Sequence, residues 1–401
     1  MCIRDRFKGT GSIESGVSAV GGSVNLVSKE AHLGDANKVS AGIGTDSYRR
    51  LTADLNKQLT DTTAVRINLM KHYNQVADRD DVDYDRWGIA TSFGFGLGTD
   101  TRFFVDTFYQ KDTNTPDGGV PIQRGTDGHR MPGVKRSDWY GDSSLYTQEN
   151  ATTSLTARFE HDFDWHDAHL RNQTRWERSD NFAVLSPARF FVADASGKKT
   201  CTGARCATLG YTGVGPISQV PGSTVNAYTD YVNNSNTGHG ILRGGDFGLS
   251  KRYTILDNQT DFSFTFNTGS LQHAVVSGLE FYHETYGGLK RNAEVPAGDL
   301  FFNMNDPSHS FASTYVTKGE GDPRSVIDNA GVYAGDTVTL NEQWQVLGSL
   351  RYDNWRAQTS QRGQADISST DGAVSGRVGA VYKPLPNGSI YVSYSLSLIH
   401  I

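Results

Sequence analysis

The sequence has 401 residues, of which 20% are charged, and a formal net charge of −6 at pH 7. This acidic balance, with a pI near 6.0, argues against a nucleic-acid-binding protein, which would carry a basic stripe. The mean hydropathy is −0.49, and no run of the sequence approaches the roughly 18 consecutive apolar residues of a membrane helix. These values do not exclude a transmembrane β-barrel, because a barrel strand alternates lipid-facing and lumen-facing residues.

The two ends of the chain differ in character from the rest. Residues 1–6 (MCIRDR) and 396–401 (LSLIHI) resemble translated sequencing-adapter read-through, so we expect both to be foreign and leave them out of the fold prediction. Residues 7–36 are rich in Gly and Ser, with one strand-like run at 23–28. Residues 37–395 carry a repeated alternation of apolar and polar residues that predicts β-strands. About thirteen runs fit this pattern, near 38–45, 50–58, 64–74, 87–97, 102–110, 149–160, 168–178, 253–266, 271–286, 328–340, 344–355, 373–383 and 389–395.

The clearest pair of runs lies at 326–353. Most even positions of this stretch are apolar or small, among them Val332, Val346 and Leu350, and most odd positions are polar. Alternation over about ten residues on each side of the turn at 341–343 predicts a long antiparallel hairpin. Strands of roughly nine to eleven residues can cross a bilayer, whereas those of soluble proteins usually have about five or six.

The connections between the predicted strands alternate in length. Tight turns are predicted at 59–63, 98–101, 161–167, 267–270, 341–343 and 384–388, and long loops at 75–86, 111–148, 179–252, 287–327 and 356–372. Alternate connections of an up-and-down meander lie at the same end, so the turns and the loops are on opposite sides. Short periplasmic turns and long extracellular loops are typical of bacterial outer-membrane barrels. The sequence therefore predicts an all-β, transmembrane, antiparallel up-and-down β-barrel, with a soluble sandwich, propeller or repeat protein as the alternative.

Five short motifs carry a family resemblance. Residues 16–29 read GVSAVGGSVNLVSK, 158–163 read RFEHDF, 170–176 read LRNQTRW, and the hairpin contains GVYA and GSLRYD. In this order they resemble TonB-dependent outer-membrane siderophore receptors, especially the catecholate type. The resemblance implies that 7–36 is the C-terminal end of a plug domain. Residues 37–395 would then be part of a 22-stranded barrel with a plugged lumen.

The resemblance also implies a function for the parent protein. A ferric siderophore would bind from outside, and TonB, with its inner-membrane energising complex, would release it inward through the plug. Outer-membrane lipid and lipopolysaccharide would surround the barrel in the bacterial outer membrane. Neither a cofactor nor an enzyme activity is expected, since the siderophore carries the iron and the sequence has no G-x-S-x-G, H-E-x-x-H or phosphate-loop motif. The alternatives are a receptor for haem, cobalamin or an oligosaccharide, and a passive porin or structural barrel.

The loop 111–148 is the candidate ligand site, because it has the densest group of basic and aromatic residues. Arginine offers fixed donors to oxygen ligands, and aromatic faces pack against catechol rings. The predicted ligand-binding residues are Arg124, His129, Arg130, Arg136, Trp139 and Tyr140. The alternative is a solvated loop whose cations pair with Asp127, Asp138 and Asp142.

Three other groups of residues need an interpretation. Cys201 and Cys206 lie in the longest loop, where an oxidising exterior favours a disulfide over free thiols or half of a metal site. The carboxylates of Asp78, Asp80, Asp81, Asp83 and Asp85 lack EF-hand spacing and are interpreted as a solvated acidic loop. His161, His166 and His169 have no acidic or thiolate partner at a convincing spacing. No metal site is predicted.

Overall fold

Every regular element in the described part of the chain is a β-strand. The computed structural model describes residues 4–8, 22–120, 129–130, 133–185, 188–190, 192–193, 199–200, 240–243, 247–294, 301–303, 307, 309, 314–317, 323–385 and 387–396. Within them, no helix is long and apolar enough to cross a membrane.

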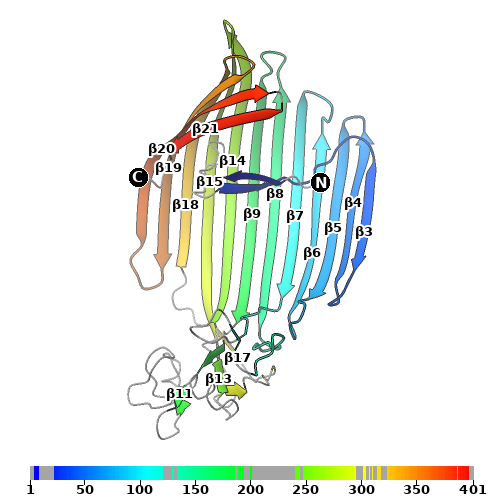
Figure 1. The fold of residues 1–401 in the computed structure, drawn as a ribbon, viewed down its shortest axis with the longest axis vertical. Helices are drawn as coiled ribbons and strands as arrows, with labels where there is room; N and C mark the ends of the chain where they lie inside the picture. The colour runs from blue at the N-terminus through cyan, green and yellow to red at the C-terminus, as the bar shows by residue number, and fades with distance from the viewer. Residues whose placement is uncertain are drawn as a thin grey trace.

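The main sheet is built from thirteen consecutive antiparallel strands (Figure 1). They are β3 (Ala36–Ile43), β4 (Arg49–Thr60), β5 (Thr63–Gln75), β6 (Asp83–Phe95), β7 (Thr101–Asn114), β8 (Thr147–Asp162), β9 (His169–Leu185), β14 (Phe247–Thr268), β15 (Leu271–Glu294), β18 (Pro323–Thr339), β19 (Trp344–Gln361), β20 (Ile367–Leu385) and β21 (Gly388–Leu396). Each pairs with the next in this order, which confirms the predicted up-and-down fold.

The remaining strands are short. They are β1 (Arg4–Lys8), β2 (Gly22–Leu26), β10 (Ala188–Phe190), β11 (Val192–Ala193), β12 (Lys199–Thr200), β13 (Gly240–Arg243), β16 (Phe301–Asn303) and β17 (Thr314–Thr317). β17 pairs with β15, and β1 pairs with β2. β1 thus includes residues 4–6, which the sequence analysis left out of the fold. Among the described residues, nothing pairs with the outer edge of β3 or of β21, so the sheet is open and forms part of a barrel.

The connections alternate as predicted, with one exception. The tight connections that follow β4, β6, β8, β14, β18 and β20 join strand ends on one side of the sheet, and the strand ends that flank the longest connections, 115–146, 186–246 and 295–322, lie on the other side, lower in Figure 1. The prediction of a long loop at 356–372 was wrong, because β19 and β20 leave only residues 362–366 between them. Beyond Tyr352 the apolar alternation fades, although the backbone hydrogen bonds to the neighbouring strands continue. The sequence pattern therefore marks the end of the apolar band and not the end of the strand.

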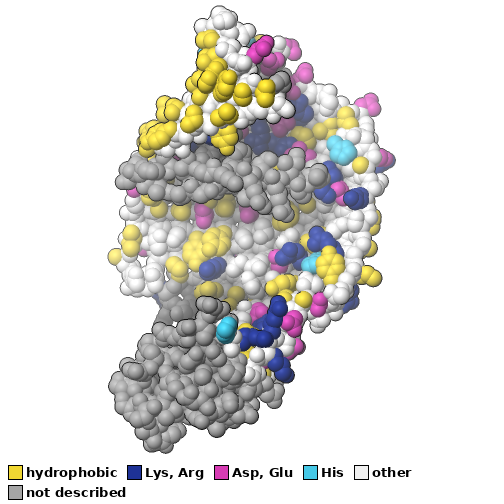
Figure 2. All heavy atoms as spheres, viewed as in Figure 1, with side chains coloured by type: hydrophobic (Ala, Val, Ile, Leu, Met, Phe, Trp, Pro, Cys, Tyr) yellow, Lys and Arg dark blue, Asp and Glu magenta, His cyan; other side chains and the backbone are white. Residues whose placement is uncertain are grey.

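The two faces of the sheet differ in polarity. One face, here called the outer face, exposes large apolar side chains from every strand, such as Leu51, Phe93, Leu256 and Leu350, the last with 65% of its surface accessible. Trp344, Val346, Leu350 and Tyr352 all lie on it, as the alternation requires. The opposite, inner face is lined with charged and polar groups, and Figure 2 shows basic and acidic side chains side by side in this view. This polar inner face accounts for the low mean hydropathy of a sheet with an apolar outer face.

Candidate functional site

The predicted ligand loop folds around a small apolar core. Trp139 is 1% exposed and packs with Val82, Tyr146 and Val184. Its ring Nε1 donates a hydrogen bond to the carbonyl oxygen of Pro116 at 3.0 Å. The Trp139 ring also stacks on His309, with 5.4 Å between the ring centroids. A core of this kind gives the loop a defined shape, because an indole with a satisfied N–H is stable when buried.

Polar contacts tie three connections to one another. Arg79, from 76–82, forms a bidentate ion pair with Asp117, with distances of 2.8 and 2.6 Å. The backbone N–H of Asp80 donates to Ser137 O at 2.8 Å. Both the backbone N–H and Oγ of Ser143 donate to His309 O at 2.8 Å. Residues 76–82, 115–120, 133–146 and 309, here called the loop cluster, therefore form one packed unit.

The structure separates the predicted ligand residues into two groups. His129, Arg130 and Arg136 are exposed; Arg136 has 74% of its side chain accessible and lies 3.3 Å from Asp78. Trp139 and Tyr140 are only 1% and 4% exposed, so the structure gives these two a packing role and leaves them little surface to offer a ligand. Arg124 lies outside the described residues, as do Cys201 and Cys206.

Two carboxylates named in the alternative interpretation accept hydrogen bonds within the loop, and the third, Asp127, lies outside the described residues. Asp138 accepts a hydrogen bond from the backbone N–H of Lys135 at 2.8 Å, and Asp142 accepts two from Ser144 at 2.9 and 2.6 Å. Both aspartates are buried and help to shape the loop. Arg79 and His309 could not be identified from the sequence, since each contacts a loop that is distant in sequence.

The segment 27–35, which connects β2 to β3, lies against the inner face. Its backbone N–H groups at Ala31 and His32 donate to Ser92 Oγ and Asn56 Oδ1, at 3.0 and 3.1 Å. The fully buried Asn56 returns hydrogen bonds from Nδ2 to the carbonyl oxygens of His32 and Gly34. Side chains of β4 and β6 thus satisfy a backbone that forms no regular structure of its own.

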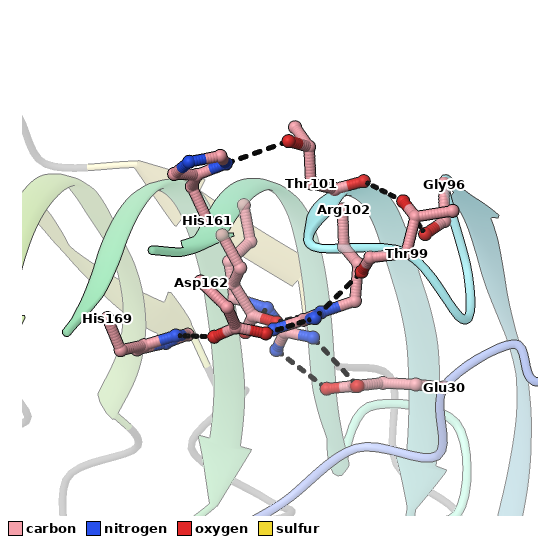
Figure 3. A network of polar contacts seen from close by, with 10 residues as sticks. Glu30, Gly96, Thr99, Thr101, Arg102, His161, Asp162 and His169 are labelled. Carbon is pink, nitrogen blue, oxygen red and sulfur yellow. Dashed lines mark hydrogen bonds and ion pairs between the residues drawn. The ribbon is translucent and has the colours of Figure 1, made fainter. Parts of the chain in front are cut away.

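A ladder of charges continues from this segment along the inner face (Figure 3). Arg158 Nη1 and Nη2 donate to the two oxygens of Glu30, both at 2.7 Å, and Arg158 Nε lies 2.9 Å from Glu160. Arg102 lies 3.2 Å from Glu160 and 2.6 Å from Asp162. Residues on β7 and β8 therefore hold the segment through alternating charges, and bidentate arginine pairs are the stronger kind.

The ladder ends beside a tight turn. His169, at the start of β9, has its Nδ1 atom 2.6 Å from Asp162 Oδ1. His161 contacts Thr101 at 2.8 Å from its Nδ1 atom. Two of the three histidines that we noted in the sequence thus have polar partners. Within the described residues, no group of three or more His, Cys, Asp or Glu is arranged to hold a metal ion.

A second polar cluster lies on the inner face of β15, β18 and β19. Arg351 is almost fully buried and donates to both oxygens of Asp353, at 2.8 and 2.7 Å, and to Glu280. Its guanidinium lies over the ring of Tyr333 at 5.3 Å. Two glycines give these large groups room: a Cβ at Gly278 would lie 2.4 Å from the Tyr333 ring, and one at Gly331 would lie 2.2 Å from Arg351. This cluster joins strand to strand.

A comparison with known families identifies the chain. The family model described as TonB dependent receptor-like, beta-barrel matches residues 83–398. The chain belongs to the TonB-dependent receptor family. This confirms the resemblance drawn from the sequence, and it confirms the bacterial outer membrane as the location of the receptor. Proteins of this family are outer-membrane receptors and transporters. The tight turns therefore lie on the periplasmic side and the loop cluster outside, and the outer face of the sheet meets lipid.

Curated relatives of this receptor extend well beyond the chain. The catecholate siderophore receptor Fiu of Escherichia coli (strain K12) is 31% identical over 426 residues, which cover 98% of this chain and 50% of Fiu. The probable TonB-dependent siderophore receptor PiuA of Acinetobacter baumannii is 26% identical over 423 residues, covering 97% and 50%. The chain spans about half the length of the curated relatives it matches.

Solved structures of two such receptors share the fold. The ferric-catecholate import receptor Fiu from E. coli K12, in its open form, has a TM-score of 0.76 and 26% identity, covering 97% of this chain and 58% of Fiu. The siderophore receptor PiuA from A. baumannii has a TM-score of 0.80 at 22% identity, covering 97% and 53%. The second likeness concerns the fold alone.

Proposed function

We propose that the receptor containing this chain takes up a ferric siderophore, of the catecholate type, across the outer membrane. The observation that carries this proposal is the 31% identity to a catecholate siderophore receptor over 98% of the chain. Iron is cargo held by the siderophore, and no cofactor or covalent chemistry is involved. No observation on this chain favours haem, cobalamin or an oligosaccharide as the solute.

Each part of the chain would have a different role in this uptake. Residues 7–36 would form the end of the plug domain and 37–395 the barrel wall, and β1 and β21 extend beyond these bounds to Arg4 and Leu396. The exposed His129, Arg130 and Arg136 would meet the anionic chelate, together with Arg124. Trp139 and Tyr140 would act indirectly, because their burial in the loop cluster holds Arg136 in place. A disulfide between Cys201 and Cys206 would stiffen the longest loop.

Release of the ligand requires the plug to move relative to the wall. TonB would pull on the N-terminal part of the plug, and the hydrogen bonds and the charge ladder at 27–35 would resist that pull. Because the arginines of the ladder lie on β7 and β8, the segment would stay attached to the wall while the plug rearranges. This makes 27–35 the fixed end of the moving domain.

Growth under iron limitation tests the proposal. The full-length receptor is expressed in a strain lacking siderophore uptake, with and without TonB, and supplied with ferric catecholates, ferric hydroxamates or haem. We expect TonB-dependent growth on catecholates. Growth on haem or hydroxamates alone would assign a different solute, and catecholate-fed growth without TonB would contradict the energised mechanism.

A further inference from the structure

An aspartate lies on the outer face of the sheet, close to the periplasmic end of β18. The register of this strand is uninterrupted, so Asp336 shares the outer face with the exposed Val332. It lies four positions before Leu340, where the tight turn begins, or about 13 Å along the tilted strand at 3.3 Å per residue. An ionisable side chain that faces lipid is costly and is a candidate for a binding role.

Aromatic side chains on the outer face mark the level of this aspartate. The ring of Phe266 stacks on His273, and that of Trp344 stacks on Tyr382, with 4.6 Å between the ring centroids in each pair. Aromatic girdles of this kind lie at the interfaces of the membrane. Since His273 contacts Asp336 directly, the carboxylate is near the headgroups of the periplasmic leaflet.

Asp336 and His273 together carry one negative charge. The Nδ1 atom of His273 lies 2.6 Å from Asp336 Oδ2. Its Nε2 atom is buried and has no hydrogen-bond partner among the described residues. An imidazolium would need an acceptor for both ring N–H groups, so His273 is neutral and donates from Nδ1.

The charge of Asp336 has no counterion on the protein. Neither a lysine nor an arginine pairs with it in the described part of the chain, and its buried Oδ1 atom accepts no hydrogen bond there. The side chain is nevertheless 36% accessible. A cationic group can therefore reach it from the lipid side.

An apolar groove begins beside this carboxylate. The groove, here called the outer groove, has a volume of about 650 Å³ and crosses the outer face of β18, β19 and β20. Gly348 lies directly opposite Asp336 and keeps the floor open, because a Cβ there would have no atom within 4 Å. The groove is lined mostly by apolar or small side chains, among them Val275, Ala334, Leu350, Val374, Gly376 and Val378. Its volume lies within the range of small-ligand sites, about 300–1,000 Å³.

We propose that Asp336 and the outer groove bind phosphatidylethanolamine, a phospholipid with a primary ammonium headgroup, from the periplasmic leaflet. The ammonium supplies the countercharge that Asp336 lacks, and a hydrogen bond between two charged groups is roughly twice as strong as a neutral one. An acyl chain lies in the groove over Gly348. An anionic headgroup would be repelled by the same carboxylate. The site faces away from the lumen, so it does not depend on which solute the receptor carries.

Lipid binding to the purified, delipidated full-length receptor tests this site. Native mass spectrometry in detergent compares phosphatidylethanolamine with phosphatidylglycerol of the same acyl chains and with soluble phosphoethanolamine. We expect the wild type to prefer phosphatidylethanolamine. D336N should bind this lipid about fivefold more weakly, which corresponds to about 1 kcal/mol for one charge near a membrane surface. The control E342Q removes an exposed carboxylate from the neighbouring tight turn and should change neither lipid affinity.

A second variant leaves the carboxylate in place. G348W fills the floor of the outer groove and should weaken the binding of phosphatidylethanolamine at least as much as D336N. Equal affinities of wild type, D336N and G348W for this lipid would overturn the proposal. It would also be overturned if phosphatidylglycerol bound the wild type as tightly as phosphatidylethanolamine, or if phosphoethanolamine alone bound as tightly as the lipid.

Discussion

The ion pair between Glu30 and Arg158 gives the sharpest test of how the segment 27–35 is held. Glu30→Gln keeps the shape of the side chain but removes its charge and one of two acceptors. Hydrogen bonds to charged groups contribute about 1.5–3 kcal/mol each, and loss of one partner of a buried pair costs about 3–5 kcal/mol. Here the effect is smaller, because Glu30 is 31% exposed and Arg158 keeps Glu160 at 2.9 Å. We expect about 1.5 kcal/mol, or roughly a tenfold change in local opening.

Hydrogen exchange in the full-length receptor measures that opening. The amides of Ala31, His32 and Gly34 donate to wall side chains, so their protection reports on detachment of 27–35. Glu30→Gln should speed their exchange about tenfold and leave the strand amides of β7 and β8 unchanged. Unaltered protection at all three amides would refute the claim that the charge ladder holds the segment.

Asp35→Asn is the matched control on the same segment. Asp35 and Lys57 form an ion pair at 2.5 Å with both side chains largely exposed, and exposed pairs contribute little. The variant should change exchange less than twofold. The Lys57 hydrogen bond and the backbone N–H of Gln58 lower the pKa of Asp35. Its small contribution is therefore present above the ordinary aspartate pKa of about 3.9 and is lost as the pH falls through the lower folded-state value.

The remaining predictions concern the loop cluster, the second polar cluster and the outer face. Trp139→Ala should destabilise the loop cluster by about 3–5 kcal/mol. Limited proteolysis should then cleave 133–146 rapidly while the barrel stays intact. The control Arg136→Ala should change the stability of the loop cluster by less than about 0.5 kcal/mol. Arg351→Met leaves Glu280 and Asp353 buried without a cation and should lower the unfolding free energy of the barrel by about 3–5 kcal/mol; an unchanged urea midpoint would contradict this. Spin labels at Val346 should be accessible to oxygen in lipid, and water accessibility there would show that the register is wrong.

The strands could be predicted from the sequence because lipid imposes a simple rule on them. Within the apolar band, side chains on the outer face must be apolar, whereas those on the inner face need not be. Apolar residues at alternate positions, such as Val346 and Leu350, are therefore enough to identify a strand. The rule stops at the edge of the bilayer. Beyond Tyr352 the outer positions include Asn354 and Arg356, and the strand continues without the pattern.

The candidate site was harder to predict because its contacts are distant in sequence. Glu30 and Arg158 are 128 positions apart; Arg158 belongs to a motif that we noted only as a family resemblance, and Glu30 directly follows another such motif. The sequence of the loop 111–148 shows that it is basic and aromatic, but not which aromatic residue is buried. Trp139 is buried because Val82 and Val184 reach it from other elements.

The charges of the inner face fall into two groups with different partners. On β4 to β8, Asp54, Asn56 and Arg158 bond to the segment 27–35. On β15 to β19, Arg351 and its carboxylates bond strand to strand. The first half of the sheet therefore holds the segment 27–35 through side-chain contacts, whereas the polar cluster in the second half holds neighbouring strands together.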